Sequence, residues 1–253
     1  MAKKKNRKIW PDIVLIISAL ILGTLIVLLV WKSNHRTVIR EEDETRVLTG
    51  NYPSPSELIE ADRETYFPIM EIPDMVFARM EGVSFPEDCP VTRDELRYMK
   101  ILYWGTDGTS HQGEMVVNEA IAEDVQTIFY NLYKACYPIE SIRLVDDFGG
   151  NDEVSMANNN TSCFNGRKMT GDEDLWSKHA YGMAIDLNPL YNPYVAEDGE
   201  VILPLDGSAY VDRTKTFVMK LSEQDYGYQQ FISRGFTWGG SWDTVKDYQH
   251  FEK

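Results

Sequence analysis

The 253-residue sequence contains few cysteines, few histidines and fewer basic than acidic residues, and each shortage limits the kinds of site or partner that the protein can have. It has only three cysteines and no C-x-x-C pair, which excludes a zinc ribbon or a C-x-x-C redox motif. Basic residues are outnumbered, with 25 Lys and Arg against 40 Asp and Glu and a net charge of −15. No internal repeat or low-complexity tract is present. Such an acidic chain is poorly suited to nucleic acid, so we predict no nucleic-acid partner.

Histidine is also scarce, yet two of the four histidines lie near the C-terminus beside carboxylates. One segment contains His179, and the other contains Asp247 and His250. Two imidazoles and one carboxylate suit Zn²⁺ and leave a position for a water that is activated near neutral pH. A further carboxylate is then needed as proton acceptor, and Asp247 is the candidate. A histidine near an aspartate also occurs by chance, so spacing alone leaves a chain without metal as the alternative.

The spacing within these segments requires bends in the backbone. In an extended strand, residues seven apart point to opposite faces, as His179 and Asp186 would. Gly182 lies between them, and Gly239 and Gly240 precede the second segment. Because glycine adopts backbone angles that other residues avoid, we expect turns at these positions.

The pattern Ser-x-His-x-x-Gly-x-Ala-x-Asp, followed after Trp-Gly-Gly by Asp-x-x-His-Phe-Glu, resembles the zinc D-Ala-D-Ala carboxypeptidase family. That family shares a superfamily with lysostaphin-type endopeptidases and hedgehog domains. It includes D,D-carboxypeptidases, D,D-dipeptidases and L-Ala-D-Glu endopeptidases of bacterial walls and phages. The resemblance implies one zinc ion held by His179, Asp186 and His250, with Asp247 as general base and Ser177 lining the substrate pocket.

A third segment, from Ser155 to Arg167, also resembles the family, whose members have an arginine upstream of the first zinc ligand. By this resemblance Arg167 would hold the substrate carbonyl or the oxyanion formed during attack, a role that suits a fixed guanidinium. The stretch is polar and rich in turn residues, as expected of a site loop. A surface salt bridge is the alternative explanation of this arginine.

One long apolar run extends from Ile9 to Trp31, after a basic cluster in residues 1–8. A helix over these 23 residues would rise about 34 Å, enough to cross a hydrocarbon core of about 30 Å. No clear small-residue cleavage site follows, so we predict an uncleaved transmembrane anchor over 9–31. The positive-inside rule then places residues 1–8 in the cytoplasm and the remainder outside the cell membrane.

The remaining chain divides into a predicted stalk or linker over 32–90 and a predicted zinc peptidase domain over 91–253. The stalk is rich in charge and proline, although Leu58-Ile59 and Tyr66-Phe67-Pro-Ile69 are candidates for a short helix or for packing against the domain, and its last third is a candidate for structure. We expect a helix capped by Asn118, with an apolar stripe from Ile121 to Tyr133, and a second helix over 224–233 closed by Gly235. Expected strands cover 99–104, 115–117, 142–145, 183–187 and 236–238.

Helices and strands in this irregular order predict an α+β fold with a small, mainly antiparallel sheet and flanking helices. The family resemblance implies the same, a hedgehog-like or D,D-peptidase-like domain. His111 is interpreted as a turn residue and not as a zinc ligand. An extracytoplasmic location permits one disulfide among the three cysteines. Four aromatic residues near the predicted ligands either bind substrate or pack around the site: Trp176, Tyr181, Trp238 and Trp242.

Together these features predict a membrane-anchored zinc metallopeptidase that hydrolyses peptidoglycan stem peptides, of the D-alanyl-D-alanine carboxypeptidase type. An L-Ala-D-Glu-type endopeptidase is the alternative within the same class. Two other classes stay open: a non-catalytic zinc-containing domain that binds wall peptides or a protein, and a purely structural wall protein. The combination of predicted ligands with Asp247 and Arg167 favours the enzyme, since a non-catalytic relative would be free to lose the base.

Overall fold

The computed structural model describes residues 50–197 and 199–253, so the predicted cytoplasmic tail and transmembrane anchor lie outside the described residues. The chain divides into two compact units, residues 1–51 and residues 52–253. All helices and strands of the described residues belong to the second unit. None of these helices combines the length and the apolar character that a membrane span requires.

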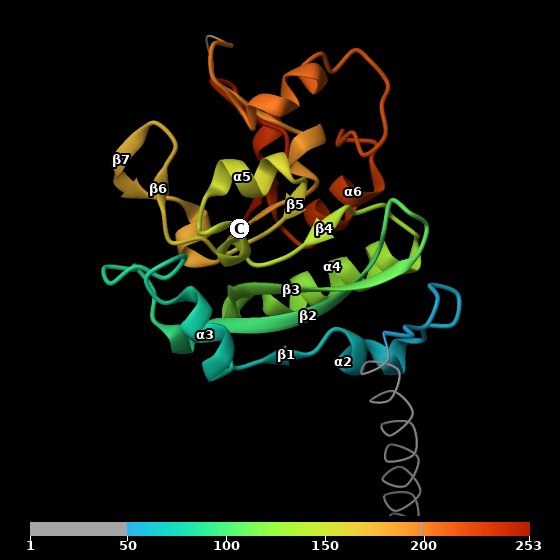
Figure 1. Ribbon diagram of the computed structural model, residues 1–253. Coiled ribbons are helices and arrows are strands. Elements are labelled where there is room, and N and C mark those ends of the chain that lie inside the picture. The colour runs from blue at the N-terminus through green and yellow to red at the C-terminus, as the bar shows by residue number, and fades with distance from the viewer. Residues whose placement is uncertain (1–49, 198) are drawn as a thin grey trace, which may run out of the picture. The chain divides into compact units, whose positions relative to one another are not determined.

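The second unit combines short helices with small sheets (Figure 1). The α-helices are α2 Arg63–Tyr66, α3 Asp74–Met80, α4 Ala122–Lys134, α5 Asp152–Ala157 and α6 Tyr226–Ser233. The strands are β1 Ile69–Met70, β2 Leu96–Trp104, β3 Ser110–Asn118, β4 Ser141–Ile142, β5 Asn160–Thr161, β6 Lys168–Met169, β7 Asp172–Trp176, β8 Ala184–Asp186, β9 Tyr194–Val195, β10 Ile202–Leu203, β11 Thr237–Trp238, β12 Lys246–Asp247 and β13 His250–Glu252. Among these strands only β4 and β5 pair in parallel, which confirms the predicted α+β class with mainly antiparallel pairing.

The longest strands, β2 and β3, form a hairpin with β1 on the outer edge of β2, and α4 lies along one face of this sheet (Figure 1). Asn118 caps the turn that leads into α4, because its side-chain oxygen accepts a hydrogen bond from the Ala120 N–H at 3.0 Å. The predicted apolar stripe is buried: Ile121, Val125, Ile128, Phe129, Leu132 and Tyr133. Burial of each large side chain stabilises the fold by about 1.5–3 kcal/mol.

The β2–β3 hairpin and α4 form a scaffold. Residues 52–90 pack against this scaffold and do not run as an extended stalk. The buried Phe67 ring meets the rings of Tyr130 and Tyr133 edge-on, with centroids 5.8 and 6.3 Å away. The Tyr133 hydroxyl also donates a hydrogen bond to the carbonyl of Pro53. The compact unit therefore begins at Tyr52, earlier than the expected boundary at residue 91, because these apolar side chains are covered by α4.

The second predicted helix is α6, and its N-cap is Asp225, whose carboxylate accepts a hydrogen bond from the Tyr228 N–H. Gly235 follows the helix with a φ of 82°, as its predicted closing role requires. Four predicted strands coincide with β2, β3, β8 and β11. The predicted strand over 142–145 is wrong beyond Ile142, because the chain turns into a 3₁₀-helix over Val145–Phe148.

A series of aromatic rings links the scaffold to the sheet of β11, β13 and β8. Phe129 of α4 meets Phe231 of α6 with ring centroids 6.4 Å apart. Phe231 in turn stacks on Phe251 of β13 at 4.2 Å. All three side chains are almost fully buried, so α6 holds the short β13 strand against the core.

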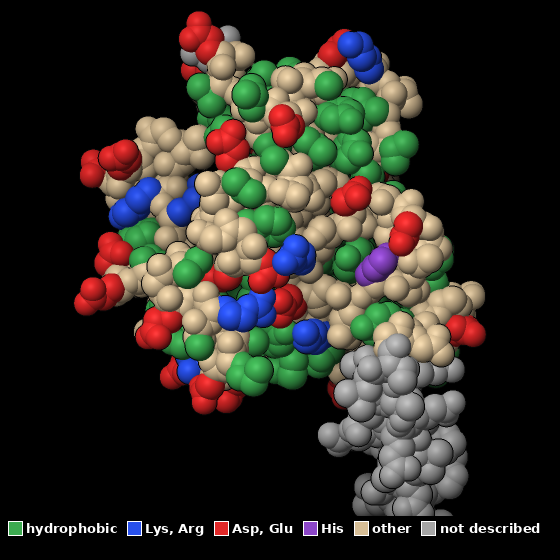
Figure 2. Space-filling model, viewed as in Figure 1, with side chains coloured by type: hydrophobic (Ala, Val, Ile, Leu, Met, Phe, Trp, Pro, Cys, Tyr) green, Lys and Arg blue, Asp and Glu red, His purple; other side chains and the backbone are tan. Residues whose placement is uncertain are grey.

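Charged side chains of both signs lie together on the exposed face shown in Figure 2. Arg79 of α3 contacts Glu114 of β3 at 2.7 Å and Asp147 at 2.6 Å. Arg143 also contacts Asp147, at 2.9 Å. This network joins α3, β3 and the turn after β4.

Candidate metal centre

The two histidine segments meet where β8 and β13 pair as antiparallel strands. In this register His250 lies opposite Asp186, and Phe251 lies opposite Ile185. Directly opposite residues of an antiparallel pair place their side chains on the same face of the sheet. Strand pairing therefore brings His250 to Asp186, although 64 positions separate them in the sequence.

His179 reaches the same place from a 3₁₀ turn, Lys178–Tyr181, directly before β8. Ser177 caps this turn, since its Oγ accepts a hydrogen bond from the His179 N–H at 3.2 Å. Gly182 ends the turn with a φ of 66°, and a Cβ there would lie 2.7 Å from the backbone nitrogen of Asn118. The predicted bend at Gly182 is confirmed, because both its backbone angle and its surroundings require glycine.

The three predicted ligands form a buried cluster whose ligand atoms all lie within 4.8 Å of one another. His179 Nε2 lies 3.2 Å from His250 Nδ1 and 3.3 Å from an oxygen of Asp186. His250 Nδ1 lies 3.2 Å from the other oxygen of Asp186. Donor atoms at usual zinc distances in a tetrahedron are about 3.3 Å apart, so the cluster has the spacing of a zinc site.

The ring nitrogens that face away from the cluster have hydrogen-bond acceptors. His179 Nδ1 lies 2.6 Å from the carbonyl oxygen of Cys163, and His250 Nε2 lies 3.1 Å from the Glu252 carboxylate. An N–H donated to each acceptor leaves the opposite nitrogen with its lone pair. Both imidazoles thus face the Asp186 carboxylate with the nitrogen that a metal would take, a donor set that fits Zn²⁺.

The electrostatics of the cluster favour a positive charge between its carboxylates. Burial lowers the pKa of His250, but hydrogen bonds to Asp186 and Glu252 outweigh burial and raise that pKa to about 10. Burial raises the pKa of Asp186, but the charges and hydrogen bonds of His179 and His250 hold it below its usual range. The hydrogen bond with His250 also lowers the pKa of Glu252.

Asp247 lies on β12 beside the cluster, with Oδ2 4.0 Å from His250 Nδ1. Its Oδ1 is buried and has no hydrogen-bond partner within the described structure, an uncommon state for a buried polar atom. Burial raises the pKa of the Asp247 carboxyl to about 6. A Cβ on Gly239 would lie 2.8 Å from the Asp247 Cβ, so the turn at Trp238-Gly-Gly approaches Asp247 only because glycine is present.

Arg167 lies just before β6, and its side chain is held by an ion pair. Nη2 contacts Asp152 at 2.7 Å, Nη1 donates to the Lys168 carbonyl, and Nε is buried without a hydrogen-bond partner among the described residues. The same segment meets the metal centre through its backbone, because the Asn165 N–H donates to the His179 carbonyl. A salt bridge is thus present, while the role of Arg167 toward substrate stays a prediction.

The other conspicuous residues lie in different surroundings. His111 is on β3 rather than in a turn, where its ring stacks on Tyr103 and its Nε2 contacts Asp107 at 3.0 Å. Cys89, Cys136 and Cys163 are free thiols.

The aromatic residues near the ligands divide into two groups. Trp238 packs in the core, with Nε1 donating to the Tyr248 carbonyl at 2.9 Å. Trp242 lies against the cluster, with its ring centroid 5.4 Å from that of His250. Trp242 is therefore better placed than Trp238 to contact a bound substrate.

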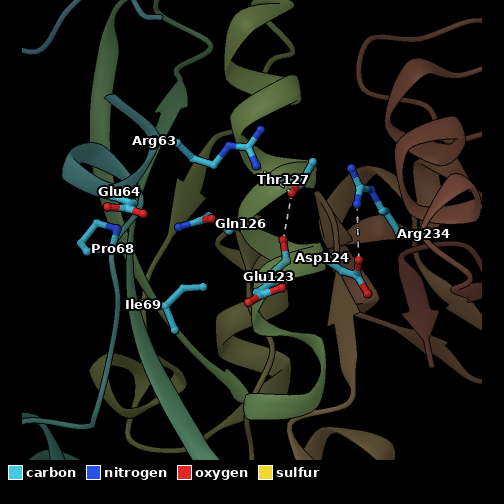
Figure 3. A pocket seen from close by; sticks show the side chains of 9 residues that line it. All are labelled: Arg63, Glu64, Pro68, Ile69, Glu123, Asp124, Gln126, Thr127 and Arg234. Carbon is cyan, nitrogen blue, oxygen red and sulfur yellow. Dashed lines mark hydrogen bonds and ion pairs between the residues drawn. The ribbon is translucent and has the colours of Figure 1, made fainter. Parts of the chain in front are cut away.

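A polar groove of about 610 Å³ lies elsewhere, between α2, β1 and α4 (Figure 3). Arg63 and Gln126 lie along this groove, and Arg234 faces Asp124 across 3.6 Å at one side. None of its nine lining residues belongs to the histidine cluster. The side chains suited to a metal ion therefore lie outside this groove.

Sequence analysis did not identify the two acceptors behind the histidines. Glu252 could have been predicted from the sequence. Residues two apart in a strand share a face, and Glu252 follows His250 by two. The Cys163 carbonyl could not have been predicted, since any residue type supplies a backbone oxygen.

Residues 170–253 match the family model of D-alanyl-D-alanine carboxypeptidases. This match confirms the resemblance, drawn from the motifs, to a family of peptidases. It includes Ser177, His179, Asp186, Asp247 and His250, and it begins just after Arg167. Searches of the curated proteins and of the solved structures found no match, so the likeness to the hedgehog and D,D-peptidase fold stays a prediction.

Proposed function

We propose that this chain is a membrane-anchored zinc peptidase that hydrolyses peptidoglycan stem peptides as a D-alanyl-D-alanine carboxypeptidase. The observation that carries the proposal is the buried cluster of His179, Asp186 and His250 beside the unpaired oxygen of Asp247. This cluster lies within the segment that matches the carboxypeptidase family. The proposed anchor is residues 9–31, with residues 1–8 in the cytoplasm and the catalytic domain outside.

His179 Nε2, a carboxylate oxygen of Asp186 and His250 Nδ1 would hold one zinc ion. When bound, zinc supplies a Lewis acid that polarises a carbonyl oxygen and acidifies a coordinated water. Asp186 contributes the only formal negative charge of this ligand set, so a divalent ion keeps net positive charge there.

Asp247 would act as the general base and then as the general acid. Its unpaired Oδ1 can accept a proton from the attacking water while the water oxygen bonds to the peptide carbonyl carbon. The same carboxyl then gives that proton to the departing amine as the carbon–nitrogen bond breaks. The products are a carboxylic acid and an amine, and the second proton of the water passes from the acid to the amine to give a carboxylate and an ammonium group.

Arg167 would hold the carbonyl oxygen of the scissile bond as negative charge develops on it. Its Nε–H is buried without a hydrogen-bond partner among the described residues, and Asp152 restrains the rest of the guanidinium. Ser177, which caps the turn of His179, would also line the substrate pocket.

The test is digestion of purified muropeptides by the full-length chain with and without a chelator, with products identified by mass. We expect hydrolysis that the chelator abolishes and added zinc restores. The Asp247→Ala variant should lose about 10²–10⁴-fold in kcat while still binding one zinc per chain. The matched control is Asp243→Ala, an exposed carboxylate four positions upstream on the same stretch, which should keep full activity.

The product masses also separate the competing functions. Release of a terminal D-alanine supports the carboxypeptidase, whereas cleavage inside the stem supports the endopeptidase. Binding of muropeptides without any product would identify a non-catalytic wall-peptide domain. Full activity in Asp247→Ala would refute the role given to this residue.

A further inference from the structure

Glu252 contacts a predicted zinc ligand from the side opposite the metal. It lies on β13 two residues after His250, and its Oε2 is 3.1 Å from His250 Nε2. The His250 side chain is 7% exposed and that of Glu252 is 26% exposed. The carboxylate therefore lies between a buried imidazole and the surface.

This contact determines which nitrogen of His250 is available to a metal. A neutral imidazole carries one N–H, and the nitrogen that carries it has no lone pair for a metal. An ionised carboxylate accepts hydrogen bonds but donates none, so when a metal takes the lone pair of Nδ1, Glu252 accepts the proton that remains on Nε2. The nitrogen left with its lone pair is Nδ1, which faces His179 and Asp186.

His179 meets the same requirement with the opposite nitrogens. Its Nδ1 faces the backbone carbonyl of Cys163 at 2.6 Å, and Nε2 faces the cluster. One ligand is thus oriented by a neutral backbone group and the other by a charged side chain. Only the second arrangement depends on a side chain that substitution can remove.

The strands beside β13 offer no obvious substitute for this carboxylate. Glu252 lies opposite Ala184 of β8, which has no polar side-chain atom, and opposite Thr237 of β11. The Thr237 hydroxyl donates to the backbone carbonyl of Glu252 at 3.2 Å. Removal of the carboxylate would therefore leave His250 Nε2 without this acceptor and the ring without its restraint.

We propose that Glu252 is a positioning residue that holds His250 in the tautomer and orientation needed to bind zinc through Nδ1. The inference rests on the proposed zinc site and adds a residue to it. A group that hydrogen-bonds to the outer nitrogen of a metal-binding histidine typically raises metal affinity by about 10–100-fold. Glu252 does not touch the substrate in this proposal and acts only through His250.

The test is a Zn²⁺ titration of the metal-free full-length chain in competition with a chromophoric chelator. Glu252→Leu, which keeps bulk but removes the acceptor, should weaken zinc binding by about 10–100-fold. Glu252→Gln keeps an acceptor oxygen without charge and should lose less. The control Thr237→Ala perturbs the strand at Glu252 but spares the carboxylate, and it should bind zinc as the unchanged chain does.

A second readout follows the imidazole directly and requires no substrate. Long-range ¹H–¹⁵N spectra of the zinc-loaded chain resolve the tautomers of its four histidines. We expect a His250 Nε2-bound proton that is protected from exchange with water in the unchanged chain and in Glu252→Gln. In Glu252→Leu that proton should exchange faster. Because Glu252→Gln is the milder change, it carries the test if Glu252→Leu fails to fold.

The outcomes distinguish this inference from the function on which it rests. If the unchanged chain binds no zinc, the proposed function fails and the role of Glu252 fails with it. If the unchanged chain binds zinc and cleaves muropeptides while Glu252→Leu keeps the same affinity and the same proton exchange, only the role of Glu252 is refuted.

Discussion

Two regions of the molecule are held in place by different interactions. One is the scaffold of β2, β3 and α4, and the other is the metal centre of β8 and β13. The scaffold has two strands of nine residues and a helix of thirteen, whereas β8 and β13 have three residues each. Long elements repeat a pattern of buried side chains and are stabilised by many contacts. The short strands are positioned by one register and a few hydrogen bonds. Stability and metal binding should therefore respond to different substitutions.

The largest expected effect on stability comes from the scaffold, with Phe129→Ala. This side chain is 1% exposed, and its removal leaves a cavity between α4 and α6. We expect a loss of about 3–5 kcal/mol in the free energy of unfolding, measured by urea denaturation of the full-length chain. Zinc affinity of the folded molecules should be unchanged.

The control for Phe129→Ala is Ile232→Ala, an apolar change at a side chain that is 37% exposed. Its loss in unfolding free energy should be much smaller than that of Phe129→Ala. If Phe129→Ala weakened zinc binding as strongly as stability, the scaffold and the metal centre would not be separable.

An intermediate effect is expected at Gly182, where the two regions meet. Its carbonyl accepts a hydrogen bond from the Asn118 N–H at 2.9 Å, and its N–H donates to the His179 carbonyl. Gly182→Ala combines a strained positive φ with a backbone clash, so we expect a loss of about 2–3 kcal/mol in unfolding free energy. Because the turn carries His179, zinc affinity should fall as well.

Gly171→Ala is the matched control, since Gly171 also has a positive φ, of 85°, but a Cβ there meets nothing within 4 Å. It should lose about 1 kcal/mol through backbone strain alone and keep its zinc affinity. Equal zinc affinities in the two variants would show that Gly182 serves only the scaffold.

The smallest effect is expected in the charge network of Arg79, and it depends on pH. Burial raises the pKa of Glu114, but hydrogen bonds from Arg79 and Tyr98 outweigh burial and lower that pKa below its ordinary 4.5. A carboxyl with a lowered folded pKa stabilises the fold above its unfolded pKa, and this contribution is lost as pH falls through the folded pKa. Arg79→Met should cost about 1 kcal/mol at pH 7, since Arg79 is partly exposed.

The same variant should also flatten the decline in stability below about pH 4.5, where the loss of the Glu114 contribution begins. Urea denaturation at a series of pH values from neutral to acid measures both effects. Arg143→Met is the control, because Arg143 is 53% exposed and forms its ion pair with Asp147 rather than with Glu114. An unchanged pH profile in Arg79→Met would contradict the role of this contact.

Prediction from sequence succeeded where one repeating pattern decides the structure. The stripe from Ile121 to Tyr133 predicted α4 together with its Asn118 cap, because a helical period needs only local sequence. It failed at residues 143–145, and for residues 52–90 it left open whether the apolar side chains pack on the domain, because burial by other segments decides the outcome. Phe67 becomes part of the core only because Tyr130 and Tyr133 cover it.

The candidate site shows the same division at the level of single atoms. The sequence by itself determined the chemistry, because two histidines, two aspartates and the glycines between them specify which donor atoms are available and where the chain can bend. Only the tertiary structure decided that His250 pairs with Asp186, that Asp247 Oδ1 has no hydrogen-bond partner, and that Glu252 and the Cys163 carbonyl lie behind the two rings. Residue types set the possible interactions, whereas register and close packing between distant segments set the distances of a few ångströms on which metal binding depends.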